Sequence, residues 1–206
     1  MTLEEITKWY QDQGWNLEDK GSEFLITKGE FIKHLSKKPI FRSEVILQLS
    51  RGEKWKAFIE VGASPGGLAE GLLPDCGQLI YVAVERVPHL KFYGLFLRTD
   101  CYDKKLGMQR KPIAFMRMDT AEAAYLIAPG AADGVMIDAQ HNYTDVVADI
   151  KMWRLKVKKG GCLFGHDYNP WGVKNASGVA YAVDEAFYEI NLFLEPSGNC
   201  VWWLRL

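Results

Sequence analysis

Two stretches of the sequence place an aspartate and a histidine close together after an apolar run. In MIDAQHNYTDV, Asp138 ends the run and His141 follows three residues later, and GCLFGHD ends in His166 and Asp167. An imidazole with a pKa of about 6.5 can accept a proton near neutral pH, and carboxylates can orient it or bind a hard cation such as Mg²⁺. We therefore take Asp138 and His141 as candidate catalytic residues and His166 as a structural residue. The alternative is that Asp138 and His141 are ordinary turn residues.

A second group of residues surrounds a glycine-rich turn in FIEVGASPGGLAEGLL. Glu60 precedes the turn, and Gly62, Gly66 and Gly67 allow the backbone to approach a ligand beside a helix N-terminus. The spacing GxxxGG differs from the GxGxxG of dinucleotide sites, and the lysine of a P-loop is missing. The next apolar run ends in Glu85, where an acid can accept hydrogen bonds from both ribose hydroxyls. These features indicate a nucleoside ligand without a pyrophosphate, although a tight strand-to-helix turn explains the glycines equally well.

These residues lie at the junctions of alternating apolar runs and helical segments. The runs KAFIEVG, QLIYVAVE, PIAFMRM, DGVMID and GCLFGHD predict buried parallel strands. The helical segments between them are GGLAEGLL, the stretch 88–106, TAEAAYLI and YTDVVADIKMWRLKV. A further helix follows Gly178, and the short link between NLFLEP and CVWWLRL permits only an antiparallel hairpin. The sequence thus predicts a doubly wound, Rossmann-like α/β sheet of seven strands, mostly parallel, with a C-terminal antiparallel hairpin.

The first 54 residues show a helical pattern. Thr2 with Glu5, and Thr27 with Glu30, have the spacing of a capping box, and FRSEVILQLSRG has helical apolar spacing that ends at Gly52. We therefore expect a helical N-terminal cap over residues 1–54 and a Rossmann-like core over 55–206. A chain of 206 residues can form both as a single domain.

The composition restricts the kind of partner. There are 25 Lys and Arg residues against 26 Asp and Glu residues, a net charge of −1, so we expect neither nucleic acid nor a membrane as partner. A small molecule is the expected partner, and a homo-oligomer stays open. The four cysteines have no metal-ligand spacing and fit a cytoplasmic protein without disulfides. The polar N-terminus differs from a signal peptide, and no apolar run is long enough to span a membrane.

From Lys56 to Leu206 the sequence resembles the class I S-adenosylmethionine-dependent methyltransferases. The resemblance rests on EVGASPGG, on Glu85 as the ribose-binding acid, on the terminal hairpin, and on MDTAEAA, whose Asp119 and Thr120 would border the adenine. A helix N-cap is the alternative role of Asp119 and Thr120. The resemblance implies S-adenosylmethionine as the cofactor and the following donor-binding residues: Glu60, Gly62, Ala63, Ser64, Gly66, Gly67, Glu85, Asp119, Thr120 and Asp138.

The later segment is similar to one branch of that family. Its members carry I-D-G-D-H-x-Y, L-x-x-G-G and G-H-D-Y, and include small-molecule O-methyltransferases related to macrocin-type and, more distantly, catechol-type enzymes. The resemblance implies O-methylation of a small molecule, with Asp138 and Asp167 as ligands of a divalent cation, expected to be Mg²⁺, and His141 as the base. Ala139 and Gln140 replace the usual glycine and aspartate. Gln140 keeps open an inactive accessory protein that binds the cofactor, and a nucleotide-dependent oxidoreductase is the other alternative.

Overall fold

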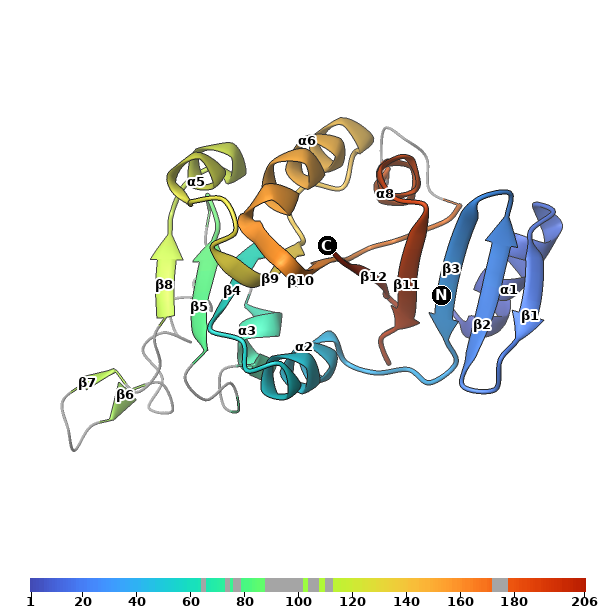
Figure 1. Ribbon diagram of the computed structural model, residues 1–206, viewed down its shortest axis with the longest axis horizontal. Coiled ribbons are helices and arrows are strands. Elements are labelled where there is room, and N and C mark those ends of the chain that lie inside the picture. The colour runs from blue at the N-terminus through green and yellow to red at the C-terminus, as the bar shows by residue number, and fades with distance from the viewer. Residues whose placement is uncertain are drawn as a thin grey trace.

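The computed structural model contains one large mixed sheet with helices on both faces (Figure 1). It describes residues 1–63, 66–72, 75, 79–87, 102–103, 108–109, 113–171 and 178–206. Within these residues the sheet has ten strands in the order β1-β2-β3-β11-β12-β10-β9-β4-β5-β8. The predicted α/β sheet is confirmed, but the predicted number of seven strands is wrong. The three further strands come from the N-terminal segment.

All seven strands predicted for the core are present. The pairs β10–β9, β9–β4, β4–β5 and β5–β8 are parallel, and the hairpin of β11 and β12 is antiparallel, as predicted. Every residue of β9 is buried, which explains why this run does not alternate with polar residues. The strands are β4 (Ala57–Val61), β5 (Ile80–Val84), β8 (Ile113–Met116), β9 (Ala132–Ile137), β10 (Val157–Gly165), β11 (Glu189–Leu194) and β12 (Cys200–Arg205).

The helices bury the two faces of the sheet under separate apolar clusters. In Figure 1, α5, α6 and α8 lie over one face, and α2 and α3 lie over the other. Ile150 and Trp153 of α6 belong to the first cluster, and Leu68 of α3 packs with Phe58 and Phe164 in the second. The elements are α1 (Leu3–Asp12), α2 (Arg42–Gly52), α3 (Gly67–Leu72), α5 (Thr120–Leu126), α6 (Tyr143–Trp153), the 3-10 turn η1 (Arg154–Lys156) and α8 (Val179–Ala186).

The N-terminal segment is not the predicted helical cap. Only α1 and α2 are helical, and between them β1 (Asn16–Asp19), β2 (Glu23–Lys28) and β3 (Phe31–Ser36) form an antiparallel meander. β3 pairs in parallel with β11, so the meander extends the core sheet. The capping box of Thr2 and Glu5 is confirmed, whereas Thr27 lies within β2 and does not cap a helix. The extended conformation of this segment depends on pairing with the distant strand β11, and the spacing of apolar residues within the segment does not indicate such a pairing.

Some predicted features lie outside the described residues. They include Ser64 and most of the helix expected over 88–106, although Tyr102–Asp103 within that stretch form strand β6, paired with β7 (Met108–Gln109). In the part of the chain that is described, no helix is long and apolar enough to cross a membrane.

Candidate active site

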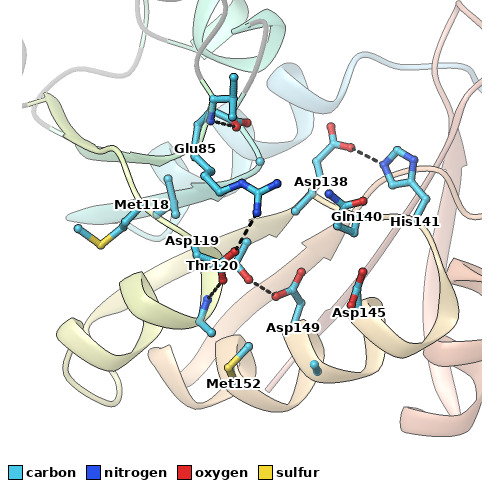
Figure 2. Close-up of a pocket in the computed structure, with 17 residues that line it drawn as sticks. Glu85, Met118, Asp119, Thr120, Asp138, Gln140, His141, Asp145, Asp149 and Met152 are labelled. Carbon is cyan, nitrogen blue, oxygen red and sulfur yellow. Dashed lines mark hydrogen bonds and ion pairs between the residues drawn. The ribbon is translucent and has the colours of Figure 1, made fainter.

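A cavity of about 700 Å³, here called the first cavity, opens at the carboxyl ends of the parallel strands (Figure 2). Gly62 follows β4, Glu85 follows β5, and Asp138 follows β9, and all three line this cavity together with Asp119 and Thr120. Parallel strands end at the same edge of a sheet, so residues far apart in the sequence meet there.

The other predicted donor-binding residues that the structure describes do not line the first cavity. Glu60 is buried and accepts a hydrogen bond from the Tyr81 hydroxyl, and burial raises the pKa of Glu60 to about 7. Ala63 is buried in the apolar cluster beneath α3, and Gly66 and Gly67 lie where that helix begins. A role of these residues in binding a donor stays a prediction.

Gly62 has a packing reason of its own. Its φ is +84°, and a Cβ atom there would overlap the carbonyl oxygen of Asp138. The Asp138 N–H also donates to the carbonyl of Val61 at 2.8 Å. A glycine is therefore needed where the chain after β4 passes the chain after β9, whether or not a ligand approaches it.

Asp119 and Thr120 combine the two roles considered for them. Asp119 is the N-cap of α5, where its carboxylate accepts the N–H of Ala121 at 3.1 Å and takes part in a capping box with Glu122. Both Asp119 and Thr120 also line the first cavity. The N-cap role is confirmed for Asp119, and the adenine contact stays a prediction.

Glu85 and its neighbours form another part of the wall. The Glu85 carboxylate accepts the N–H of Val87 at 2.8 Å, and Arg86 lies 3.9 Å from the Asp119 carboxylate. This turn holds the acid predicted to bind ribose at the edge of the cavity.

Asp149 is a buried acid of the first cavity that the sequence interpretation omitted. It lies on α6, only 3 % of its surface is exposed, and its Oδ1 accepts a hydrogen bond from the Thr120 hydroxyl at 2.6 Å (Figure 2). Burial raises the pKa of Asp149 to about 6, and the charges of Asp145 and Asp119 act in the same direction. Asp145 and Asp149 are four residues apart on α6, so helical spacing could have indicated that both face the cavity.

The predicted catalytic and metal-binding residues meet at the ends of β9 and β10. The Nε2 atom of His141 lies 3.6 Å from the Asp138 carboxylate and 3.3 Å from the Asp167 carboxylate. Nε2 is buried but forms no hydrogen bond of good geometry, so these contacts are electrostatic. Asp138 raises the pKa of His141, with Asp167 adding to the effect, and burial opposes it only in part.

His166 joins the same cluster. Its Nδ1 lies 3.1 Å from Asp167 and 3.6 Å from Asp138, and its Nε2 lies 3.0 Å from Glu195. Burial alone would lower the pKa of His166, but the hydrogen bonds with Asp167 and Glu195 outweigh it and raise the pKa to about 9. His166 is thus a cation near neutral pH, and its hydrogen bond lowers the pKa of Asp167.

Arg42 and Glu195 complete the arrangement. The Arg42 guanidinium lies 3.7 Å from Asp138 and 3.4 Å from Glu195, and the backbone N–H of Arg42 also donates to Glu195. We call these residues together the strand-end cluster: Arg42, Asp138, His141, His166, Asp167 and Glu195. Sequence reasoning missed Arg42 and Glu195 because they come from α2 and the turn after β11, which only the folded chain brings to the edge.

A second cavity, of about 320 Å³, lies beside this cluster. His141 lines both cavities, and Asp167, Tyr168, Asn169 and Trp171 line only the second. The carbonyl of His141 accepts the N–H of Gly178 at 2.7 Å, which fixes its backbone between them. Asp167 has a φ of +52°, a conformation that non-glycine residues adopt rarely and aspartate more readily than most. The cluster therefore separates a large cavity from a smaller one.

The comparison with protein families agrees with this geometry. The family described as a methyltransferase domain matches residues 62–168, from the turn after β4 to the residue after Asp167. The chain belongs to this methyltransferase family. No curated protein matches the sequence.

Solved structures of a spermidine synthase and of methyltransferases match most of the chain at low sequence identity. A spermidine synthase from Thermotoga maritima is 13 % identical, with a TM-score of 0.55, over 93 % of this chain and 68 % of that one. A 1,6-didemethyltoxoflavin N1-methyltransferase from Burkholderia thailandensis, with bound S-adenosylhomocysteine, is 10 % identical, with a TM-score of 0.52, over 92 % and 98 %. The O-methyltransferase TomG from Streptomyces achromogenes, in complex with S-adenosylmethionine, is 11 % identical, with a TM-score of 0.53, over 80 % and 79 %.

These comparisons confirm the resemblance to the class I methyltransferases. They leave the acceptor atom open, because one of the similar structures is an N-methyltransferase and another an O-methyltransferase. At such identities they establish the fold alone, so the roles of individual residues in this methyltransferase depend on its own geometry.

Proposed function

We propose that this protein transfers the methyl group of S-adenosylmethionine to an oxygen of a small molecule. The observation that carries the proposal is the position of His141, which lines both the first and the second cavity. The first cavity has the size of a cofactor site and is lined by five of the predicted donor residues, namely Gly62, Glu85, Asp119, Thr120 and Asp138. The second is large enough for part of a small acceptor, and the two meet at a residue that can take a proton.

The reaction requires positioning and the removal of one proton. The acceptor oxygen attacks the methyl carbon in line with the carbon–sulfur bond, which breaks and leaves its electron pair on sulfur. The acceptor hydroxyl gives its proton to His141. Because Nε2 of His141 faces two carboxylates, a proton on Nε2 is stabilised there, and Nδ1 is left as the accepting nitrogen. Asp138 thus orients the base.

A divalent cation fits the same group of side chains. One ligand atom each from Asp138, His141 and Asp167 can be chosen so that all lie within 4.8 Å of one another, and the buried Nε2 of His141 has no hydrogen-bond partner. Asp138 and Asp167 would hold the ion, which would supply Lewis-acid activation of the acceptor hydroxyl. One nitrogen of His141 cannot both bind the ion and be protonated, so the two roles of Nε2 exclude each other.

Donor binding is the first test. Calorimetry on protein freed of copurified ligand is expected to show binding of S-adenosylmethionine and S-adenosylhomocysteine, and no binding of nicotinamide dinucleotides. The reverse result would favour the oxidoreductase and overturn the proposal.

Acceptor methylation separates an enzyme from an accessory protein. A panel of hydroxylated small molecules is offered with isotopically labelled donor. We expect transfer to at least one of them, and a loss of about 100-fold or more in His141→Ala with donor binding retained. Donor binding without transfer to any acceptor, or equal transfer by His141→Ala, contradicts the proposed enzyme or base.

Cation binding has a readout of its own. Mg²⁺ or Mn²⁺ is expected to raise the melting temperature of the chelator-treated wild type but not that of Asp167→Asn, because a ligand that binds only the folded state stabilises it. Full activity and an unchanged melting temperature in excess chelator would remove the cation from the mechanism.

A further inference from the structure

Asp149 is a buried carboxyl that forms no ion pair with any described residue. Its described partner is the Thr120 hydroxyl, and no lysine, arginine or histidine nitrogen among the described residues forms an ion pair with it. The charged neighbours that act on it, Asp145 and Asp119, are acidic as well. A buried carboxyl in this situation is costly unless a further hydrogen-bond donor approaches it.

The position of Asp149 indicates where such a donor would come from. Asp149 lines the first cavity, so a ligand there can reach the carboxyl oxygen that Thr120 does not use. Asp119, the other acid at this end, is already occupied by the N–H of Ala121 and faces Arg86. Asp149 differs from Asp119 in being buried and in having no ion-pair partner among the described residues.

The surrounding side chains suit a flat ring. Met118 and Met152 line the same cavity, and Figure 2 shows both away from His141, on the side of Thr120 and Asp149. Thioethers pack well against aromatic rings. In a donor built on adenosine, the base is the flat ring and its exocyclic 6-amino group is a hydrogen-bond donor.

We propose that Asp149, held by the Thr120 hydroxyl, accepts a hydrogen bond from the 6-amino group of the donor's adenine and so selects adenine over a 6-oxo purine. This proposal rests on the proposed function, since it takes the first cavity as the donor site. Asp149 is then a specificity-determining residue contributed by α6, away from the strand ends that hold the other predicted donor residues.

The test compares S-adenosylhomocysteine with its 6-oxo analogue, S-inosylhomocysteine, by calorimetry. The wild type is expected to bind S-adenosylhomocysteine at least about tenfold more tightly, because a site built to accept a hydrogen bond rejects a ligand that presents an oxygen. In Asp149→Asn, an amide N–H can face the 6-oxo group, so the preference should fall by about tenfold or reverse. A merely structural role of Asp149 would weaken both ligands alike.

Asp145→Asn is the matched control. It removes a carboxylate of the same cavity, one helical turn away, and should change both affinities together and leave their ratio as in the wild type. If Asp149→Asn does not fold, Thr120→Val tests the same pair and should reduce the preference. Equal binding of the two ligands by the wild type, or an unchanged ratio in the folded Asp149→Asn, overturns the inference. Failure of the wild type to bind S-adenosylhomocysteine at all instead refutes the proposed function.

Discussion

Lys33 and Asp149 are both buried charged residues, but their side chains have different kinds of partner. Lys33 of β3 is 2 % exposed, and its Nζ lies 2.5 Å from the Asp184 carboxylate of α8. The same nitrogen lies 5.1 Å and 5.3 Å from the ring centres of Trp15 and Tyr168. Among the described residues, the hydrogen-bond partner of the Asp149 side chain is the Thr120 hydroxyl. The ion pair of Lys33 joins the N-terminal meander to α8. Asp149 instead faces the first cavity, where a ligand can supply a further hydrogen-bond donor.

The first prediction concerns the buried ion pair of Lys33 and Asp184. Lys33→Met keeps the apolar stem but removes the charge that pairs with Asp184 between the meander and the core. Loss of one partner of a buried ion pair costs about 3 to 5 kcal/mol, and the lower end applies here because the side chain of Asp184 is 33 % exposed. Denaturant unfolding should show this loss, while affinity for S-adenosylhomocysteine in the folded variant stays close to that of the wild type.

A surface pair supplies the control. Lys8 and Asp12 on α1 form an ion pair with both side chains more than half exposed, so Lys8→Met should change the free energy of unfolding by less than about 1 kcal/mol. If the two lysine variants lose the same free energy of unfolding, the buried ion pair of Lys33 contributes no more to stability than the exposed pair of Lys8, and the prediction is wrong.

The second prediction concerns Asp149 and the dependence of the protein's stability on pH. Because the pKa of Asp149 is raised to about 6 in the folded protein, the folded state binds a proton that the unfolded state has already released. Its contribution to stability is therefore fully present below the unfolded pKa of about 4 and is lost as the pH rises through 6. Between pH 4 and pH 7 the wild type should lose about 2 to 3 kcal/mol relative to Asp149→Asn.

Chemical unfolding at several pH values checks this difference. Glu30→Gln removes a charge from the exposed turn between β2 and β3, which is not among the charges that act on Asp149, and serves to subtract the general effect of net charge. A difference between wild type and Asp149→Asn that stays constant over this range would show that the burial of Asp149 does not shift its titration.

Sequence patterns predicted the Rossmann-like core, which contains Asp149, better than the N-terminal meander, which contains Lys33. The strands β4, β5, β8 and β9 are mostly apolar runs, and the residues after the runs identified the edge where Asp138 and Glu85 lie. The burial of both faces of β4 and β9 leaves a clear apolar signal in these two strands, so the centre of the core was predictable from local composition.

The N-terminal meander gave no such signal. Its strands β1 to β3 are short and contain charged residues, and Lys33 reads as a surface residue until Asp184, 151 positions later, is brought beside it. Arg42 and Glu195 were missed for the same reason, since each becomes part of the strand-end cluster only through tertiary contacts. Pairings over such separations are set by the whole fold and cannot be read from spacing along the chain.

The smallest predicted effect distinguishes the hydrogen bonds around Lys33 from its charge. The Tyr10 hydroxyl lies 3.0 Å from the Tyr168 hydroxyl, which in turn donates to the Asp184 carboxylate at 2.8 Å. Tyr10→Phe keeps the ring beside Lys33 and removes one neutral hydrogen bond, which should cost about 1 kcal/mol. Denaturant unfolding of Tyr10→Phe, Lys33→Met and the double variant measures how the two are coupled. Because Tyr10 reaches Lys33 through Tyr168 and Asp184, its removal should cost less once Lys33 is gone. Strictly additive losses would mean that the hydroxyl chain and the buried charge stabilise the junction independently.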